Sequence, residues 1–181
     1  MSRVSARAVA SSLLLGVERL VDRRNLLNKF EILTSVHSHL SDIEKGKGFQ
    51  EIGWLAIYVS TVVVREVAHS SKSASMHILH EMSELYNKSL AFRDFEPMQV
   101  SALADEYVAR LETYDQITID FVRKPEHRPD RWFLALAKAA EEHCYGSTGR
   151  GDAALELVLM IGYLNKVLHE LLKSTLTGAQ S

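Results

Sequence analysis

The stretch from Phe49 to Ala68 constrains the fold more than any other part of the chain, because it is apolar on nearly every side. A segment without a polar face is usually buried at the centre of a domain, where other elements cover it all round. Its β-branched residues leave a strand as an alternative to a helix. We favour the helix, because the sequence offers no second strand to pair with it and a lone strand is not stable. The apolar positions are Ile52, Trp54, Leu55, Ile57, Tyr58, Val59, Val62, Val63, Val64 and Val67.

Apolar residues recur at helical spacing along the rest of the chain, and only three prolines and nine glycines interrupt it. This pattern predicts helices rather than a many-turned β fold. The second helix should stop around Gly46 and Gly48, and Pro97 should begin the fifth. We therefore predict an all-α fold, a single-domain helical bundle of about seven helices over residues 1–181, with disordered ends at roughly 1–3 and 177–181. The expected helices are 4–22, 26–45, 49–68, 74–92, 97–121, 132–145 and 153–176.

Charge and cysteine content narrow the environment and the partners. The net charge of −2 predicts no general attraction to nucleic acid or to an anionic membrane surface. The longest apolar run, Ile52 to Val64, is shorter than the roughly 20 residues that a membrane-spanning helix needs. The single cysteine, Cys144, cannot form an internal disulfide, and we expect a half-buried structural thiol. These features predict a cytoplasmic protein with no nucleic-acid partner and no membrane partner.

Four polar residues share one face of the predicted helix 74–92. They are His77, His80, Glu81 and Glu84, at positions i, i+3, i+4 and i+7. Two imidazoles and two carboxylates on one stripe suit a divalent metal ion. The same residues also suit a helix face that simply meets solvent. The His-Glu-x-x-His order of zinc proteases is not present, because here the order is His-x-x-His-Glu.

Two acidic motifs occur on successive predicted helices. Glu81-Met-Ser-Glu84 is followed one helix later by Glu112-Thr-Tyr-Asp115. This arrangement resembles the all-helical nucleoside triphosphate pyrophosphohydrolases, the MazG-like group. The resemblance implies that the four carboxylates hold Mg²⁺ against a triphosphate, since hard oxygen ligands suit Mg²⁺ and a diphosphate leaving group needs its charge neutralised.

The same resemblance implies that Lys88 or Arg110 lies near the phosphates. The chain departs from the family at His80, which stands where the family carries a further glutamate before the first motif.

A third pattern surrounds His69, in the sequence Ala68-His69-Ser70-Ser71-Lys72-Ser73. It resembles the histidine phosphotransfer domains, helical bundles that expose a phosphorylatable histidine with a lysine three residues later. The resemblance implies that Lys72 neutralises the phosphoryl group on His69. Ser71 and Ser73 depart from the leucine and glycine that the family usually carries at those positions.

The remaining hypothesis is a regulatory protein without catalysis and without a cofactor. It would act through protein–protein contacts and associate with itself through an exposed apolar face of helix 49–68 or of helix 153–176. We take this as the first functional expectation. The Mg²⁺-dependent hydrolase and the phosphotransfer protein are its alternatives.

Overall fold

The computed structural model describes residues 5–22, 42–67, 72–91, 97–122, 130–145 and 152–177. These ranges contain six α-helices and no strand, which confirms the all-α class. The prediction of about seven helices is slightly off for this part of the chain, because most of the predicted helix 26–45 lies outside it. The helices are α1 (Ala6–Leu20), α4 (Asp42–Val67), α5 (Lys72–Ala91), α6 (Pro97–Val122), α7 (Asp130–Tyr145) and α8 (Asp152–Thr177).

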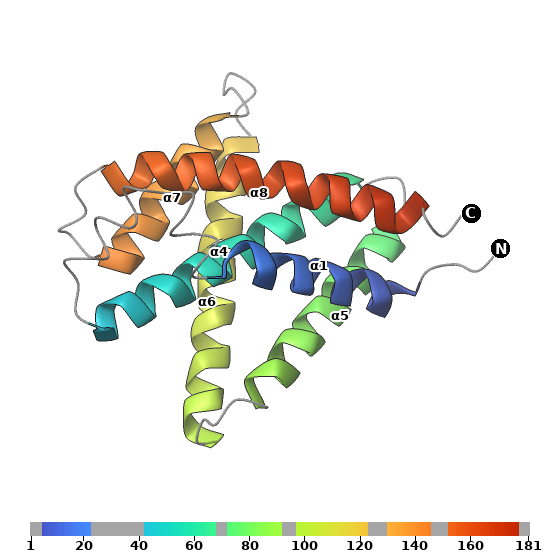
Figure 1. Cartoon of the computed structure of the whole chain (residues 1–181), viewed down its shortest axis with the longest axis horizontal. Helices are drawn as coiled ribbons and strands as arrows, with labels where there is room; N and C mark the ends of the chain where they lie inside the picture. The colour runs from blue at the N-terminus through green and yellow to red at the C-terminus, as the bar shows by residue number, and fades with distance from the viewer. Residues whose placement is uncertain are drawn as a thin grey trace.

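Helix α4 lies at the centre of the described fold (Figure 1). It contacts α1, α5, α6, α7 and α8, so every other described helix packs against it. From Ile52 to Val64 all its residues are buried except Gly53 and Thr61, which are half-buried. The apolar stretch is therefore the central helix that its composition predicts, and the strand alternative is wrong.

The predicted break at Gly46 and Gly48 is also wrong, because α4 runs through both glycines without interruption. A glycine inside a helix costs about 1 kcal/mol relative to alanine, which tertiary packing can offset. Gly48 is buried, and its carbonyl oxygen lies 3.7 Å from the Sγ of Cys144 on α7. Helix α7 therefore packs against the α4 backbone at this glycine.

Helices α1 and α8 run in opposite directions along the long axis of the molecule (Figure 1). The Ser5 Oγ accepts a hydrogen bond from the Ala8 backbone N–H at 3.2 Å and so caps the start of α1. The two helices approach closely at Gly16, where an added β-carbon would lie 2.6 Å from a methyl carbon of Leu171. A small residue at this position lets the α1 backbone lie directly on the α8 side chains.

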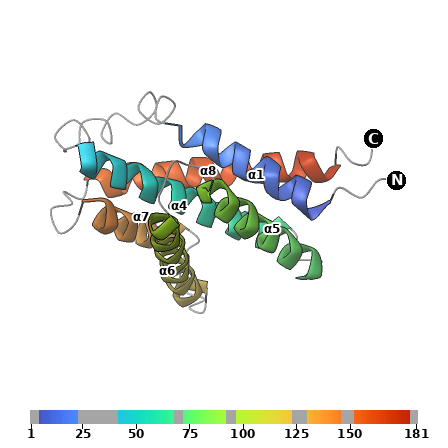
Figure 2. The same ribbon diagram turned by 90° about the horizontal axis from the view of Figure 1, so that it is seen from below.

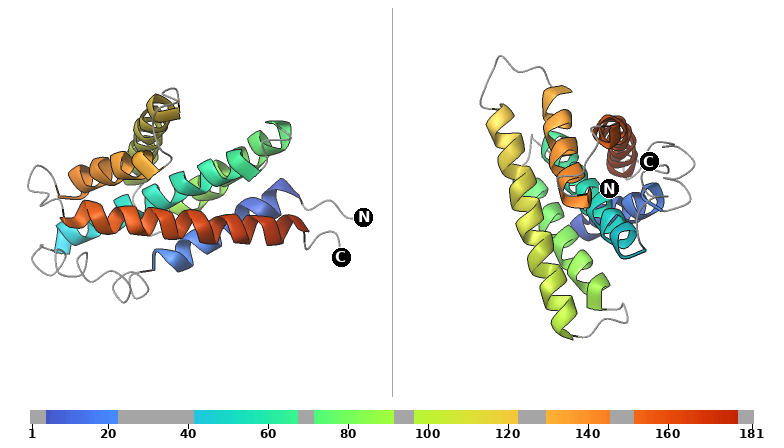
Figure 3. Two further views of the ribbon diagram at one scale, coloured as in Figure 1. Left: turned by 90° about the horizontal axis from the view of Figure 1, so that it is seen from above. Right: turned by 90° about the vertical axis from the view of Figure 1, so that its left-hand side faces the viewer.

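Helix α6 lies on the opposite side of the molecule from α1 and α8, with α4 between them (Figures 2 and 3). It begins at Pro97, as predicted. Helix α7 packs against α4, α6 and α8. Helices α5 and α6 diverge from their joined ends, and α4 crosses the opening between them (Figure 1). This divergence creates the space in which the candidate site lies.

Two further predictions, on membrane-spanning helices and on the chain ends, can be compared with the described residues only. Among the described residues, no helix is both long and apolar enough to cross a membrane. The ends predicted to be disordered lie outside the described ranges, apart from Thr177, which closes α8.

Two glycine substitutions test the close contact between α1 and α8. Gly53→Ala should raise the free energy of unfolding by about 1 kcal/mol, because its β-carbon would meet nothing within 4 Å. Gly16→Ala should give little or none of this gain, because the Leu171 methyl group must move. Urea unfolding of both variants measures the difference. Equal gains would show that α1 and α8 do not meet closely at Gly16.

Candidate functional site

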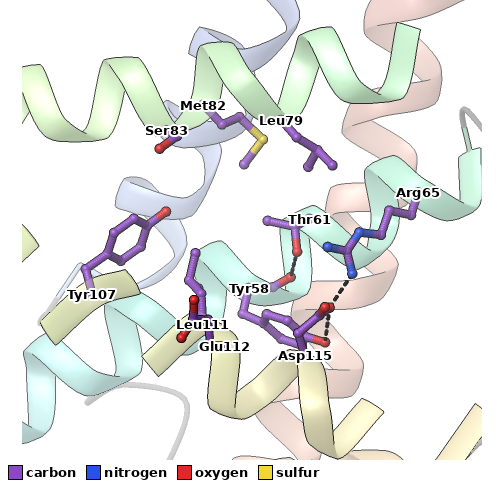
Figure 4. A pocket seen from close by; sticks show the side chains of 10 residues that line it. All are labelled: Tyr58, Thr61, Arg65, Leu79, Met82, Ser83, Tyr107, Leu111, Glu112 and Asp115. Carbon is purple, nitrogen blue, oxygen red and sulfur yellow. Dashed lines mark hydrogen bonds and ion pairs between the residues drawn. The ribbon is translucent and has the colours of Figure 1, made fainter. Parts of the chain in front are cut away.

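A groove of about 250 Å³ lies between α4, α5 and α6. Each helix contributes residues from one face, which is why positions three or four residues apart recur in the lining. The volume is below the range of about 300–1,000 Å³ that is usual for drug-sized ligands. The groove therefore suits a small molecule or a single side chain of a partner. Figure 4 shows the lining residues, which are Tyr58, Thr61, Arg65, Leu79, Met82, Ser83, Tyr107, Leu111, Glu112 and Asp115.

One end of the groove is closed by polar contacts between α4 and α6. Arg65 forms a charge-assisted hydrogen bond with the Asp115 carboxylate. The Tyr58 hydroxyl donates to the Thr118 Oγ1 at 2.7 Å and lies 3.4 Å from the Asp115 Oδ1. Thr118 in turn donates to the Tyr114 carbonyl oxygen at 3.0 Å. These side chains satisfy one another, so this end is fixed without a ligand.

The other end holds polar groups that have no such partners. Tyr107 is only 3% exposed, and its ring stacks on the ring of Tyr86 with centroids 4.2 Å apart. Its hydroxyl has no hydrogen-bond partner in the described part of the chain, and neither has the hydroxyl of Ser83. Glu112 is exposed at the rim and forms no ion pair with any described residue. Burial raises the pKa of Tyr107, so its hydroxyl keeps its proton at neutral pH.

Close to this groove, a carboxylate is buried between α4, α6 and α7. Glu51 is 3% exposed and accepts a hydrogen bond from the Tyr114 hydroxyl. Its other oxygen lies 2.9 Å from the Arg110 Nε, although the Nε–H is not directed at it. The His143 Nδ1 lies 3.5 Å from the first oxygen. Residues of α4, α6 and α7 therefore meet at one buried carboxylate, which suits a structural role.

Two further residues of α7, Cys144 and Glu141, lie near the Glu51 cluster. Cys144 is buried rather than half-buried as predicted, and burial raises the pKa of its thiol, so it remains protonated. The Glu141 carboxylate accepts a hydrogen bond from the Ala154 backbone N–H at 3.3 Å. A carboxylate at the start of a helix satisfies a free N–H group and favours the helix dipole. Helix α7 therefore caps α8.

The four predicted Mg²⁺ ligands do not form one group in the structure. Glu81 on α5 points to α1, where the Arg7 guanidinium lies 3.6 Å away. Glu84 is exposed and pairs with Lys88 at 3.6 Å. Only Glu112 and Asp115 line the groove. Within the described ranges, no three histidine, cysteine, aspartate or glutamate side chains are placed to hold a metal ion, and the metal site stays a prediction.

The other predicted residues lie at the surface or outside the described ranges. His69 of the phosphotransfer motif lies outside them, and Lys72 is the exposed first residue of α5. His77 and His80 are exposed, as expected for a helix face that meets solvent. Glu51 was not predicted as a site residue, although its position in the apolar stretch is a signal that could have identified it. An acidic residue in a segment that is apolar all round needs a buried partner.

Helix α8 carries a second surface feature on its outward face. Leu155 and Leu159 are 61% and 66% exposed and lie one helical turn apart. The opposite face of α8 is buried in the core, with Leu157, Leu164 and Leu168 fully enclosed. The two exposed leucines are therefore not part of the core of this chain.

Comparison of the chain with protein-family models, with curated proteins and with solved structures gives no match.

The buried charge of Glu51 gives a stability prediction. Arg110→Met should lower the free energy of unfolding by about 3 kcal/mol, because it removes the guanidinium from a buried carboxylate. Arg65→Met is the matched control, since it removes an ion pair whose arginine is 49% exposed and should cost at most about 1 kcal/mol. Urea unfolding at neutral pH measures both. Similar costs for the two variants would contradict a buried pair at Glu51.

The buried tyrosines predict a loss of stability at alkaline pH. Burial raises the pKa of Tyr58 from 10.0 to about 12, and burial also raises the pKa of Tyr107 and Tyr114. The folded state then holds these protons longer than the unfolded chain does. Stability is full below about pH 10 and falls above it, by about 1.4 kcal/mol per pH unit for each such tyrosine.

Urea unfolding at several pH values between about 9 and 12 tests this expectation. In Tyr58→Phe the free energy of unfolding should fall less steeply with pH, because one proton fewer is released on unfolding. A slope that is unchanged in this variant would mean that Tyr58 ionises equally well in both states.

Proposed function

We propose that this protein is a non-catalytic regulatory protein that acts through protein–protein contacts and pairs with a second copy of itself through α8. The observation that carries the proposal is the exposure of Leu155 and Leu159 on the outward face of a helix whose other face is core. Adjacent exposed leucines are typical of interaction surfaces, because water contact with apolar area is unfavourable.

The surface of α8 is better suited to this role than that of α4. The sequence left both helices open as interfaces, but the apolar residues of α4 are covered by the chain's own helices. On α8, the leucines remain in contact with solvent although the helix is otherwise packed on α1, α4 and α7.

A second copy of the chain is the simplest partner for the exposed leucines. A two-fold axis places the same patch on both sides of an interface, so no complementary surface is required elsewhere. If the axis passes between Leu155 and Leu159 and the helices run antiparallel, Leu155 of each copy faces Leu159 of the other. Burying one leucine contributes about 1.5–3 kcal/mol, so four leucines provide a useful part of the association energy.

The groove between α4, α5 and α6 gives such a protein a separate place for recognition, since no α8 residue lines it. We place this function in the cytoplasm, because a buried free thiol at Cys144 suits a reducing compartment. The proposal requires no cofactor.

Substitution of the two leucines tests the proposal. The double variant Leu155→Glu, Leu159→Glu should raise the dissociation constant of the dimer by on the order of 100-fold or more, because it removes apolar area and adds repelling charges. Sedimentation equilibrium over a range of protein concentrations measures this constant. Helix content should not change.

Met98→Glu is the control, since Met98 is 83% exposed on α6, far along the chain from α8. It should leave the dissociation constant unchanged. A wild-type chain that remains monomeric at all concentrations, or a double variant that still dimerises as well as wild type, would refute self-association through α8.

A further inference from the structure

The groove between α4, α5 and α6 has two polar ends, and the side chains have partners at only one of them. At that end, Arg65, Asp115 and Tyr58 bind one another. At the other end, the hydroxyls of Tyr107 and Ser83 and the carboxylate of Glu112 have no partner among the described residues. A ligand in the groove would therefore meet these three groups.

The hydroxyl of Tyr107 is the most informative of them. Tyr107 is 3% exposed as a residue, but its hydroxyl is not among the fully enclosed polar atoms that lack a hydrogen-bond partner, so this oxygen is open to the groove. Figure 4 shows this hydroxyl directed into the groove, on the same side as Ser83. A ligand with a suitable polar group can therefore bond to this oxygen in place of solvent.

The charges of the lining residues indicate whether the ligand is a cation or an anion. Glu112 and Asp115 contribute two negative charges to the lining and Arg65 contributes one positive charge, so the groove carries a net charge of −1. The Arg65 guanidinium is already bound to Asp115, whereas the Glu112 carboxylate is not paired with any described cation. A cation is therefore favoured over an anion.

The hydrogen-bond acceptors in the groove indicate which kind of cation fits it. An ionised carboxylate only accepts hydrogen bonds, and each hydroxyl oxygen accepts as well as donates. A primary ammonium group has three donors and no acceptor, which matches Glu112, Ser83 and Tyr107. The aromatic ring of Tyr107 adds a surface that attracts a cation.

The middle of the groove is apolar. Leu79 and Met82 of α5 and Leu111 of α6 lie between the two polar ends (Figure 4). A short hydrocarbon chain fits such a surface, and the volume of about 250 Å³ leaves no room for a large ligand.

We infer that this groove binds a primary ammonium group on a short apolar stem, with the ammonium held by Glu112, Ser83 and Tyr107 and the stem on Leu79, Met82 and Leu111. This is the chemistry of a lysine side chain of a partner and of a free alkylamine. The site does not depend on self-association, because α8 takes no part in it.

Titration calorimetry of the full chain with n-pentylamine tests the inference. We expect saturable binding of the amine, and binding at least about tenfold weaker for n-pentanol, which has the same stem without the charge. Glu112→Gln and Tyr107→Phe should each weaken amine binding at least about tenfold. Phenylalanine keeps the ring that stacks on Tyr86, and Glu112 is exposed, so both variants should fold.

Asp105→Asn is the matched control, because Asp105 is an exposed acid on the same helix and does not line the groove. It should leave amine binding unchanged. The inference is overturned by any one of three results: no saturable binding of n-pentylamine, equal binding of n-pentanol, or binding that survives in both groove variants.

A second ligand separates the two sources of the ammonium group. Nα-acetyl-lysine methylamide carries the same ammonium on a peptide backbone. If it binds as tightly as n-pentylamine, the groove accepts the lysine side chain of a partner protein. If only the free amine binds, the ligand is a small molecule. Either result supports the ammonium site, and the leucine variants of α8 should not change it.

Discussion

The burial of the middle of α4, from Glu51 to Val64, is the constraint from which the rest of the structure follows. A helical segment without a solvent face must have its polar groups satisfied inside the protein, because an unpaired buried polar group is costly. Ser60 and Thr61 donate to carbonyl oxygens one turn earlier on α4 itself, at 2.6 and 2.8 Å. Trp54 and Glu51 cannot do so, and they find partners on neighbouring helices.

These two side chains set how the neighbouring helices sit on α4. The Trp54 indole N–H donates to the Tyr86 hydroxyl on α5 at 2.6 Å. Glu51 holds Tyr114 and Arg110 of α6 and lies near His143 of α7. The polar contacts therefore fix the register of three helices that apolar packing alone would leave free to slide, since apolar contact is not directional. The groove forms where α5 and α6, held in this way, diverge.

The sequence was sufficient for the fold class and for most helices, because apolar periodicity and scarce breakers depend on local spacing. The central position of α4 and the start of α6 at Pro97 were predicted on these grounds. The break at Gly46 and Gly48 was predicted wrongly for a reason that local sequence does not contain. Whether glycine ends a helix depends on what packs against it, and Gly48 lies where α7 approaches.

The candidate site was predicted less well, because it is built from residues that are distant in the sequence. Glu112 and Asp115 were singled out as acids, but their pairing with Glu81 and Glu84 assumed that the two motifs face each other. Glu81 instead meets Arg7 of α1, which no spacing rule indicates. Tyr107 was not predicted as a site residue, because apolar spacing predicts that a tyrosine is buried but not where its hydroxyl points.

The contact of Glu141 with the first turn of α8 has a consequence for the leucines that follow it. The first turns of helices usually fray, because their N–H groups have no partner within the helix. Here the Ala154 N–H is held by a side chain of α7, one residue before Leu155. The exposed leucines are thus presented on a turn that is already ordered. A partner that binds there loses little free energy to conformational entropy, so a small contact area can give a higher affinity than it would on a frayed end.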